Sequence, residues 1–274
     1  MAPAIAYKKK GDCIMFSIFN RKPTAQKVKA WRTPGGQVYT LYSELAQAPH
    51  CLIAGATGSG KSTVMEGMIC TVLAMNSPAN ARFTLIDTKR VALSHLRNLP
   101  HVIEYADTIG TAEAALIAAA GRMDARYEQM QRQGLREWQG TDEYIVIDEA
   151  GDILTSARKK AFTQLIQHIS MLGRAAHVHL WIGSQVVTRE VISTSIKANI
   201  DTRIALRTAT AQESRNIVGV NGAETFPKPA IAGKCYGIIR DGGDINTWIM
   251  PRYSEQQAAF LLDWWMDSRK SVAA

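Results

Sequence analysis

The stretch Gly55-Ala56-Thr57-Gly58-Ser59-Gly60-Lys61-Ser62 decides the fold of this chain. It follows a short apolar run, residues 50–55, that predicts a buried strand, and it opens a helical pattern over residues 61–75. Glycines followed by a lysine and a hydroxyl residue, between a strand and a helix, match the phosphate-binding loop of nucleoside triphosphatases in residues and in context. The sequence therefore predicts a nucleotide site at this loop.

Each residue type in the loop has a chemical task. Glycines let consecutive backbone N–H groups turn toward a phosphate chain, and the following helix contributes the positive end of its dipole. Lys61 would place its charge on the β- and γ-phosphate oxygens, and the Ser62 hydroxyl would complete the coordination of a magnesium ion. We expect ATP and Mg²⁺ as cofactors, with the nucleotide held by Gly55, Thr57, Gly58, Ser59, Gly60, Lys61, Ser62 and Thr63.

A second motif, Tyr144-Ile145-Val146-Ile147-Asp148-Glu149, predicts an apolar strand that ends in two acids. Asp148 would hold the magnesium ion through water, and Glu149 would polarise the attacking water as a general base. A glutamate at this point favours hydrolysis over phosphoryl transfer to a small molecule. The alternative interpretation is that the two acids only cap the next helix.

Polar residues also follow two other predicted strands. Asp87-Thr88-Lys89 follows the strand expected over residues 82–87, and Gln185 follows the one expected over residues 179–184. Ligands bind at the carboxyl ends of strands in parallel sheets. We expect Gln185 to sense the γ-phosphate or to orient the attacking water. Lys89 has two interpretations, a functional residue or an ordinary surface lysine.

The remaining pattern alternates strands and helices and therefore predicts an α/β fold with a mostly parallel sheet that carries helices on both faces. We expect two parts, a basic N-terminal arm (residues 1–37) and a catalytic domain (residues 38–274). The boundary is expected where Pro34-Gly35-Gly36 precedes the core. A capping box, Ser254 with Gln257, predicts a final helix. The other helices are expected over residues 111–133 and 156–172, and the other strands over residues 101–105, 202–207 and 234–240.

Composition narrows the class of protein. The 274 residues include 32 Lys and Arg against 24 Asp and Glu, a net charge of +8. Residues 1–50 hold eight basic and two acidic residues, so this segment alone carries +6 and the basic excess lies in the N-terminal arm. Such an arm suits nucleic acid or an anionic membrane surface, or is a solvated tail. Without a long apolar run or a CxxC pair, we expect a cytoplasmic protein with no transmembrane segment, disulfide framework or structural zinc.

Beyond these motifs, the chain resembles the FtsK/SpoIIIE family of DNA translocases over roughly residues 38–250. The runs Arg-Ala-Ala-His-Val-His-Leu (174–180) and Lys-Ala-Asn-Ile-Asp-Thr-Arg (197–203) are more specific than the phosphate loop. The resemblance implies a RecA-like ATPase that assembles as a ring, usually a hexamer, around double-stranded DNA and binds ATP between subunits. It is carried by residues 50–62, 83–89, 145–150, 173–180, 196–205, 214–218 and 222–224.

The resemblance also implies roles for individual residues. Arg174 matches an arginine finger that reaches the γ-phosphate of the neighbouring subunit, a role worth about 10³–10⁵ in rate. From the sequence alone, Arg174 could equally balance the dipole at a helix C-terminus. Lys197 and Arg215 match positions near the DNA-facing pore loops.

The chain also departs from the family pattern. Val186 stands where arginine is common, and Ala211 where lysine is expected, with Arg189 and Arg207 as candidates to compensate. We therefore expect Arg189, Lys197 and Arg215 to contact DNA. The membrane-spanning and winged-helix modules of the family are not evident, which predicts a minimal motor, such as mobile elements encode.

Three functions follow from this reading. The main one is an ATP-driven double-stranded DNA translocase. One alternative is an ATPase that energises conjugative transfer or packaging of DNA presented by a partner such as a relaxase. The other is a slow, nucleotide-switched DNA-binding assembly, which the missing charges at Val186 and Ala211 favour.

Overall fold

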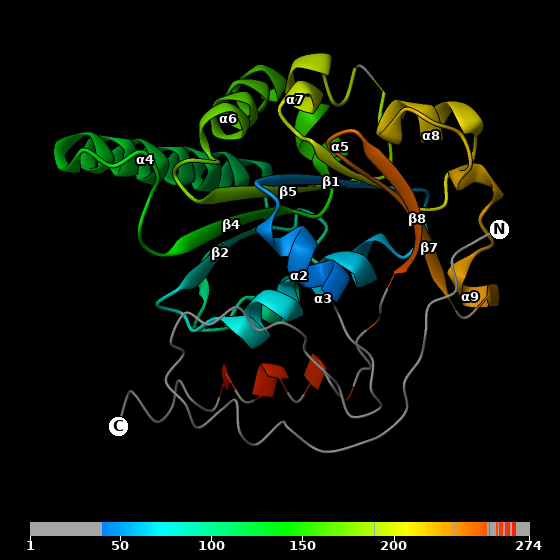
Figure 1. Ribbon diagram of the computed structural model, residues 1–274, viewed down its shortest axis with the longest axis horizontal. Coiled ribbons are helices and arrows are strands. Elements are labelled where there is room, and N and C mark those ends of the chain that lie inside the picture. The colour runs from blue at the N-terminus through cyan, green and yellow to red at the C-terminus, as the bar shows by residue number, and fades with distance from the viewer. Residues whose placement is uncertain are drawn as a thin grey trace.

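The computed structural model describes residues 40–188, 190–232 and 234–250, together with residues 252, 256, 258–259, 261–263 and 265–266. Its centre is an eight-stranded sheet with the order β3-β2-β4-β5-β1-β6-β7-β8 (Figure 1). Strands β1 to β6 are parallel, and β7 and β8 are antiparallel to their neighbours. The strands are β1 (His50–Ala54), β2 (Ala81–Ile86), β3 (Val102–Ala106), β4 (Asp142–Ile147), β5 (Val178–Ser184), β6 (Thr202–Ala205), β7 (Cys235–Asp241) and β8 (Asp244–Met250).

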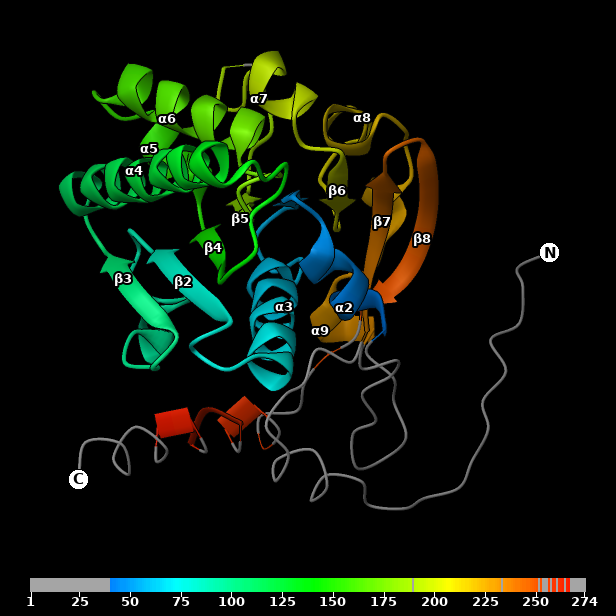
Figure 2. The same cartoon turned by 60° about the vertical axis from the view of Figure 1, so that its left-hand side comes forward.

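Helices cover both faces of the sheet. Helices α4, α6 and α7 lie on one face, and α2 and α3 lie on the other (Figures 1 and 2). This arrangement confirms the predicted α/β fold. The helices are α2 (Thr40–Gln47), α3 (Lys61–Met75), α4 (Ile109–Gln133), α5 (Ala150–Leu154), α6 (Lys159–Leu172), α7 (Thr194–Ala198), α8 (Ala211–Val218) and α9 (Pro229–Ala232), with short 3₁₀ turns at Ser94–Leu96 and Ala223–Thr225.

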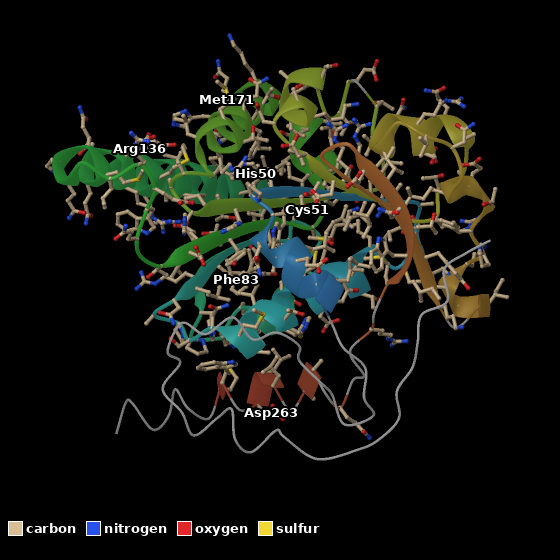
Figure 3. All side chains as sticks on the ribbon, viewed as in Figure 1. His50, Cys51, Phe83, Arg136, Met171 and Asp263 are labelled. Atoms are coloured by element: carbon tan, nitrogen blue, oxygen red, sulfur yellow. The ribbon has the colours of Figure 1, made fainter. Side chains whose placement is uncertain are left out.

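Each face of the sheet has its own apolar core. Strand side chains alternate between the faces, so neighbours such as Leu52 and Ile53 belong to different cores although both are fully buried. Small residues on α4, among them Ala115 and Ala119, pack against the first core. The second core includes Cys51 and Phe83, which are labelled in Figure 3. Central strands buried on both faces form the rigid frame that holds the loops at the sheet edges.

Helix α2 was not predicted and packs directly on α3. The contact is close because Gly67 of α3 has no side chain: a Cβ there would lie 2.5 Å from Cε2 of the buried Tyr42. Helix α2 thus fixes the orientation of α3, whose first residues belong to the phosphate loop. The apolar residues 41, 42, 45 and 46 recur at helical spacing, but eight residues are too short to predict a helix alone, and tertiary packing supplies the rest.

Several predicted elements differ from the structure. The helix expected over residues 156–172 begins at Lys159, and a separate helix, α5, precedes it. The strand expected over residues 202–207 ends at Ala205. Strand β7, expected over residues 234–240, runs antiparallel to β6 and forms a hairpin with the unpredicted β8. The two-residue turn contains Gly242 at φ 57°, the left-handed conformation that such hairpins require.

Some predictions lie outside the described residues. These are the basic arm (residues 1–37) and the Ser254–Gln257 capping box. Farther on, Trp265 donates its indole N–H to the Leu73 carbonyl at 3.0 Å and packs edge-on against His101. Within the part of the chain that the structure describes, no helix combines the length and apolarity needed to cross a membrane.

Candidate nucleotide-binding site

The glycine-rich loop, residues 55–62, joins β1 to α3 at the carboxyl edge of the sheet. Gly58 and Gly60 adopt φ values of 73° and 97°, which side-chain-bearing residues rarely take. The Ala56 N–H donates to the Arg207 carbonyl at 2.8 Å, and the Gly55 N–H donates to the Ser184 carbonyl at 3.3 Å. The loop is therefore anchored to both strands that flank β1.

The loop offers an anion cradle. The first backbone N–H groups of α3 have no intrahelical acceptor, and they point out of the helix end with the positive pole of its dipole. The open space at Gly58, where a Cβ would meet nothing within 4 Å, leaves room beside them. Ser62 is exposed at this end of α3, whereas Lys61 is buried. These features fit a phosphate chain.

Lys61 and Asp148 form a buried ion pair in this site. The Nζ of Lys61 lies 2.8 Å from Oδ1 of Asp148 and also donates to its backbone carbonyl. Both side chains are about 90% buried, so each charge depends on the other for compensation. Strand β5 approaches Asp148 closely, because residue 183 is a glycine whose added Cβ would lie 2.2 Å from the Asp148 carbonyl oxygen.

The two oxygens of Glu149 have different surroundings. Oε1 accepts from the Gln185 N–H at 3.0 Å, and from the Gly151 N–H and the Ser184 hydroxyl at 3.3 Å each. Oε2 is buried without a hydrogen-bond donor among the described residues. One oxygen thus fixes the carboxylate, and the other keeps its acceptor capacity. Glu149 is also the N-cap of α5, with its side chain accepting from the Gly151 N–H, so it does cap the next helix, and its catalytic role stays a prediction.

Lys89 borders this site, although its side chain is 44% exposed. Its Nζ lies 3.8 Å from Oε2 of Glu149 and 3.8 Å from Oδ1 of Asp152. Asp152 in turn accepts from the Thr88 hydroxyl at 2.8 Å. The sequence left the role of Lys89 open, and the pairing of β2 with β4 brings it to Glu149.

Gln185 lies where the sequence predicted, at the end of β5 and beside the loop. Its side-chain oxygen accepts from the Thr57 hydroxyl at 3.1 Å.

Sequence reasoning missed Cys235, whose thiol donates to the Ser59 carbonyl at 3.2 Å. Burial raises the pKa of the Cys235 thiol to about 11, so it stays protonated. No local signal marked Cys235, since its position depends on the direction of β7.

Arg174 lies on the opposite side of the molecule from the loop. It follows α6 and precedes β5, at the amino ends of the parallel strands, and it is exposed. A triphosphate in this chain's own loop lies at the other edge of the sheet. The Arg174 side chain can therefore serve a nucleotide only in another subunit.

The expected DNA-contacting residues lie around α7 and α8. Lys197 of α7 donates from Nζ to the Asn216 carbonyl of α8 at 3.4 Å. Arg215 of α8 donates to the Asn221 side chain at 2.6 Å and to Gln212 at 3.0 Å. The structure thus brings Lys197 next to α8. Arg189 lies outside the described residues.

Comparison with known proteins identifies the family. The model of the FtsK/SpoIIIE family matches residues 22–231. This chain belongs to the FtsK/SpoIIIE family. The DNA translocase SpoIIIE of Bacillus subtilis is 32% identical over 232 residues, which cover 77% of this chain and 29% of that protein. A DNA translocase FtsK of Lactococcus lactis is 32% identical over 201 residues, covering 66% and 26%. The chain thus spans about a quarter of the length of these relatives.

Solved structures agree on the fold of this FtsK/SpoIIIE-family chain. The cytoplasmic domain of the type VII secretion ATPase EccC from Thermomonospora curvata aligns with a TM-score of 0.65 at 24% identity, covering 81% of this chain and 28% of that one. The pCW3 conjugation coupling protein TcpA, a monomer form with ATPγS, aligns with a TM-score of 0.66 at 21% identity, covering 80% and 66%. The fold is that of a RecA-like P-loop ATPase.

Proposed function

We propose that this chain is an ATP-driven double-stranded DNA translocase that hydrolyses ATP at the interfaces of a ring, a cytoplasmic hexamer. One observation carries the proposal: Lys61, Asp148, Glu149 and Gln185 meet beside the glycine-rich loop at one sheet edge in an FtsK/SpoIIIE-family chain. These are the groups that ATP hydrolysis needs, and the family of the chain points to DNA as the substrate of the motor.

The proposed chemistry uses groups that are already oriented. The N–H groups of the loop and the Lys61 ammonium bind the phosphates. To do so, Lys61 gives up its ion pair with Asp148. Asp148 and Ser62 would then hold Mg²⁺, which would supply positive charge beside the β- and γ-phosphate oxygens. Glu149 accepts the proton of the attacking water on Oε2 while Oε1 keeps its donors, and Gln185 orients that water.

Two features support action in a ring. Arg174 is exposed at the sheet edge opposite the loop, so the finger role requires a neighbouring subunit. A head-to-tail interface that repeats closes into a ring when its rotation allows. DNA is bound, in this proposal, by Lys197, Arg215 and Arg189 and by the basic arm of residues 1–37 that precedes the motor domain of residues 38–274.

The test is steady-state ATP hydrolysis with and without linear duplex DNA over a range of protein concentrations. We expect stimulation by DNA that rises cooperatively with concentration, because the finger acts in trans. DNA binding should weaken with salt by a slope of about −0.9 in log K against log salt for each phosphate contact. Rates that duplex leaves unchanged at every salt concentration would contradict the proposal.

The surroundings of Gln185 favour a second candidate. Val186, next to it, is 51% exposed and uncharged at a position where the sequence comparison predicted arginine, and Ala211 at the start of α8 replaces an expected lysine. With fewer cations, the ATPase would depend on DNA presented by a partner such as a relaxase or a packaging protein, or would act as a slow switch. Displacement of a protein roadblock from naked duplex excludes this candidate, and co-purification with a relaxase favours it.

A further inference from the structure

The turn that carries Arg174 is held unusually firmly for an exposed connection. We call residues 173–177, between α6 and β5, the Arg174 turn. The Gly173 N–H donates to the Ile169 carbonyl at 2.7 Å, and the Val178 N–H donates back to Gly173 at 2.9 Å. His177 adopts a φ of 53°, a conformation that is uncommon for a residue other than glycine and that needs support from its surroundings.

Arg126 of α4 supplies much of this support. Its Nη1 donates to the Ala176 carbonyl at 2.7 Å and to the His177 carbonyl at 3.0 Å. The guanidinium also lies 5.2 Å from the ring centre of Trp138 and 3.5 Å from the buried Glu143 carboxylate. The Arg126 side chain is only 11% exposed. A buried guanidinium is costly unless all its contacts are made, so this cation is committed to the two carbonyls of the turn.

Side chains and backbone from other segments complete the support. The imidazole of His177 lies 2.8 Å from Oδ1 of Asp142 and 3.2 Å from Oε1 of Glu137. The backbone N–H of Trp138 donates to the Ala175 carbonyl at 2.8 Å. The Tyr127 hydroxyl donates to the carbonyl of Leu172, just before the turn, at 2.7 Å. Together these contacts fix the backbone on both sides of Arg174 and leave its side chain exposed.

We propose that Arg126 is a positioning residue for Arg174: it locks the carbonyls of the Arg174 turn, so that the Arg174 side chain projects from a rigid base toward the γ-phosphate of the neighbouring subunit. This inference rests on the proposed role of Arg174 in trans. A transition-state contact must be held within about 0.5 Å, and a misplacement of about 1 Å can lower a rate by about 10²-fold. Support of this kind is what a long side chain reaching across an interface requires.

The chain offers a matched control one turn earlier on α4. Arg122 also bonds to Glu143, with Nη2 2.7 Å from Oε1, and its other partners are Thr84 and Glu104. Among the described residues, none of the hydrogen bonds or ion pairs of Arg122 goes to the Arg174 turn. Arg122→Gln therefore removes a positive charge from the same helix and an ion-pair partner from the same Glu143. The carbonyls of the turn keep their hydrogen bonds to Arg126.

The experiment compares Arg126→Gln, Arg126→Lys, Arg122→Gln and Arg174→Ala in the full chain. We expect Arg126→Gln to lower the DNA-stimulated kcat by about 10- to 100-fold with the KM for ATP nearly unchanged, since the loss is in transition-state contact. Arg126→Lys restores part of the rate, and Arg122→Gln stays within about threefold of the parent. In an Arg174→Ala background, Arg126→Gln should lower kcat no further, because both changes remove one interaction.

The outcomes separate this inference from the proposed function. A normal rate in Arg174→Ala overturns the finger role and this inference with it, whereas the translocase proposal is contradicted only if duplex DNA fails to stimulate the parent. If Arg174→Ala is slow but Arg126→Gln behaves like Arg122→Gln, only the positioning role is overturned. Should Arg126→Gln fail to fold, Tyr127→Phe deletes a single hydroxyl contact to the residue before the turn. We expect Tyr127→Phe to show a several-fold lower kcat at unchanged KM and faster hydrogen exchange at residues 175–178, and parental values for both overturn the inference.

Discussion

The ammonium of Lys61 lies 2.8 Å from the carboxylate of Asp148 beside the glycine-rich loop. The cation expected to bind phosphate and the anion expected to hold magnesium thus neutralise each other, so neither charge is buried alone. In the proposed mechanism, nucleotide binding would break this ion pair, so that Lys61 contacts phosphate and Asp148 helps to hold magnesium. The pair also makes the stability of the fold depend on the residues of the site.

Removing one partner of the pair should destabilise the fold. We expect Lys61→Met to lower the free energy of unfolding by about 3–5 kcal/mol, because Asp148 is left buried without compensation. The double variant Lys61→Met/Asp148→Asn should recover most of that loss. Urea unfolding without nucleotide measures both values. Lys89→Met is the control on a more exposed pair and should cost less than about 1 kcal/mol, and equal losses in the two lysine variants would contradict this view.

Glu149→Gln should separate nucleotide binding from hydrolysis. The amide oxygen of glutamine can keep the acceptor role of Oε1, while the base is lost. We expect kcat to fall by about 10²–10⁴-fold with ATP affinity retained, measured by single-turnover hydrolysis and by titration of a fluorescent nucleotide. Asp152→Asn, which changes a neighbouring carboxylate with no hydrogen bond to Glu149, should stay within about threefold of the parent. Similar losses in both variants would remove Glu149 from the role of base.

Gln185 should matter for the rate more than for binding. We expect Gln185→Ala to lower kcat by about tenfold or more at little change in KM, since it removes the amide that faces the loop. Thr57→Val, which deletes only the hydroxyl that donates to this amide, is the matched control and should have a smaller effect. A larger effect from Thr57→Val would indicate that the amide only supports the loop.

Two buried histidines should make the fold sensitive to acid. Burial lowers the pKa of His101 to about 4, and burial together with the charge of His179 lowers the pKa of His50 to about 4. The unfolded chain binds these protons near pH 6.5, so stability is complete above that pH and is lost as the pH falls toward 4. Each residue contributes up to about 3 kcal/mol to this loss. His50 is labelled in Figure 3 at the start of β1.

Urea unfolding as a function of pH tests this expectation. His101→Gln should flatten the curve between pH 6.5 and 4, whereas His168→Gln, at an exposed position on α6, should leave its slope unchanged. Parallel curves for the parent and His101→Gln would show that another group drives the acid loss.

The sequence predicts the centre of the site because its signals are local. The loop of residues 55–62, Glu149 and Gln185 each sit at a strand end, and parallel strands bring such ends to one edge. The contact between Lys89 and Glu149 depends instead on the register of β2 against β4, which no local pattern encodes. Cys235 reaches the loop only because β7 runs antiparallel to β6.

Helix boundaries show the same limit. The apolar spacing of residues 156–172 continues a helical pattern, but a turn separates α5 from α6. There the Ser156 hydroxyl donates to the Ile153 carbonyl at 2.7 Å and accepts from the Arg158 N–H at 3.2 Å. Hydroxyl side chains compete with the helix for backbone groups, and periodicity does not record that competition.

Strand β5 has the Arg174 turn at one end and Gln185 at the other. Seven residues of extended chain separate the two ends by about 20 Å along a central, doubly covered strand. In the proposed ring, one end of β5 belongs to the subunit's own ATP and the other to its neighbour's. Each β5 then links two consecutive sites, with Gln185 beside one ATP and Arg174 beside the next, so a shift of this strand in one subunit would be felt at both sites.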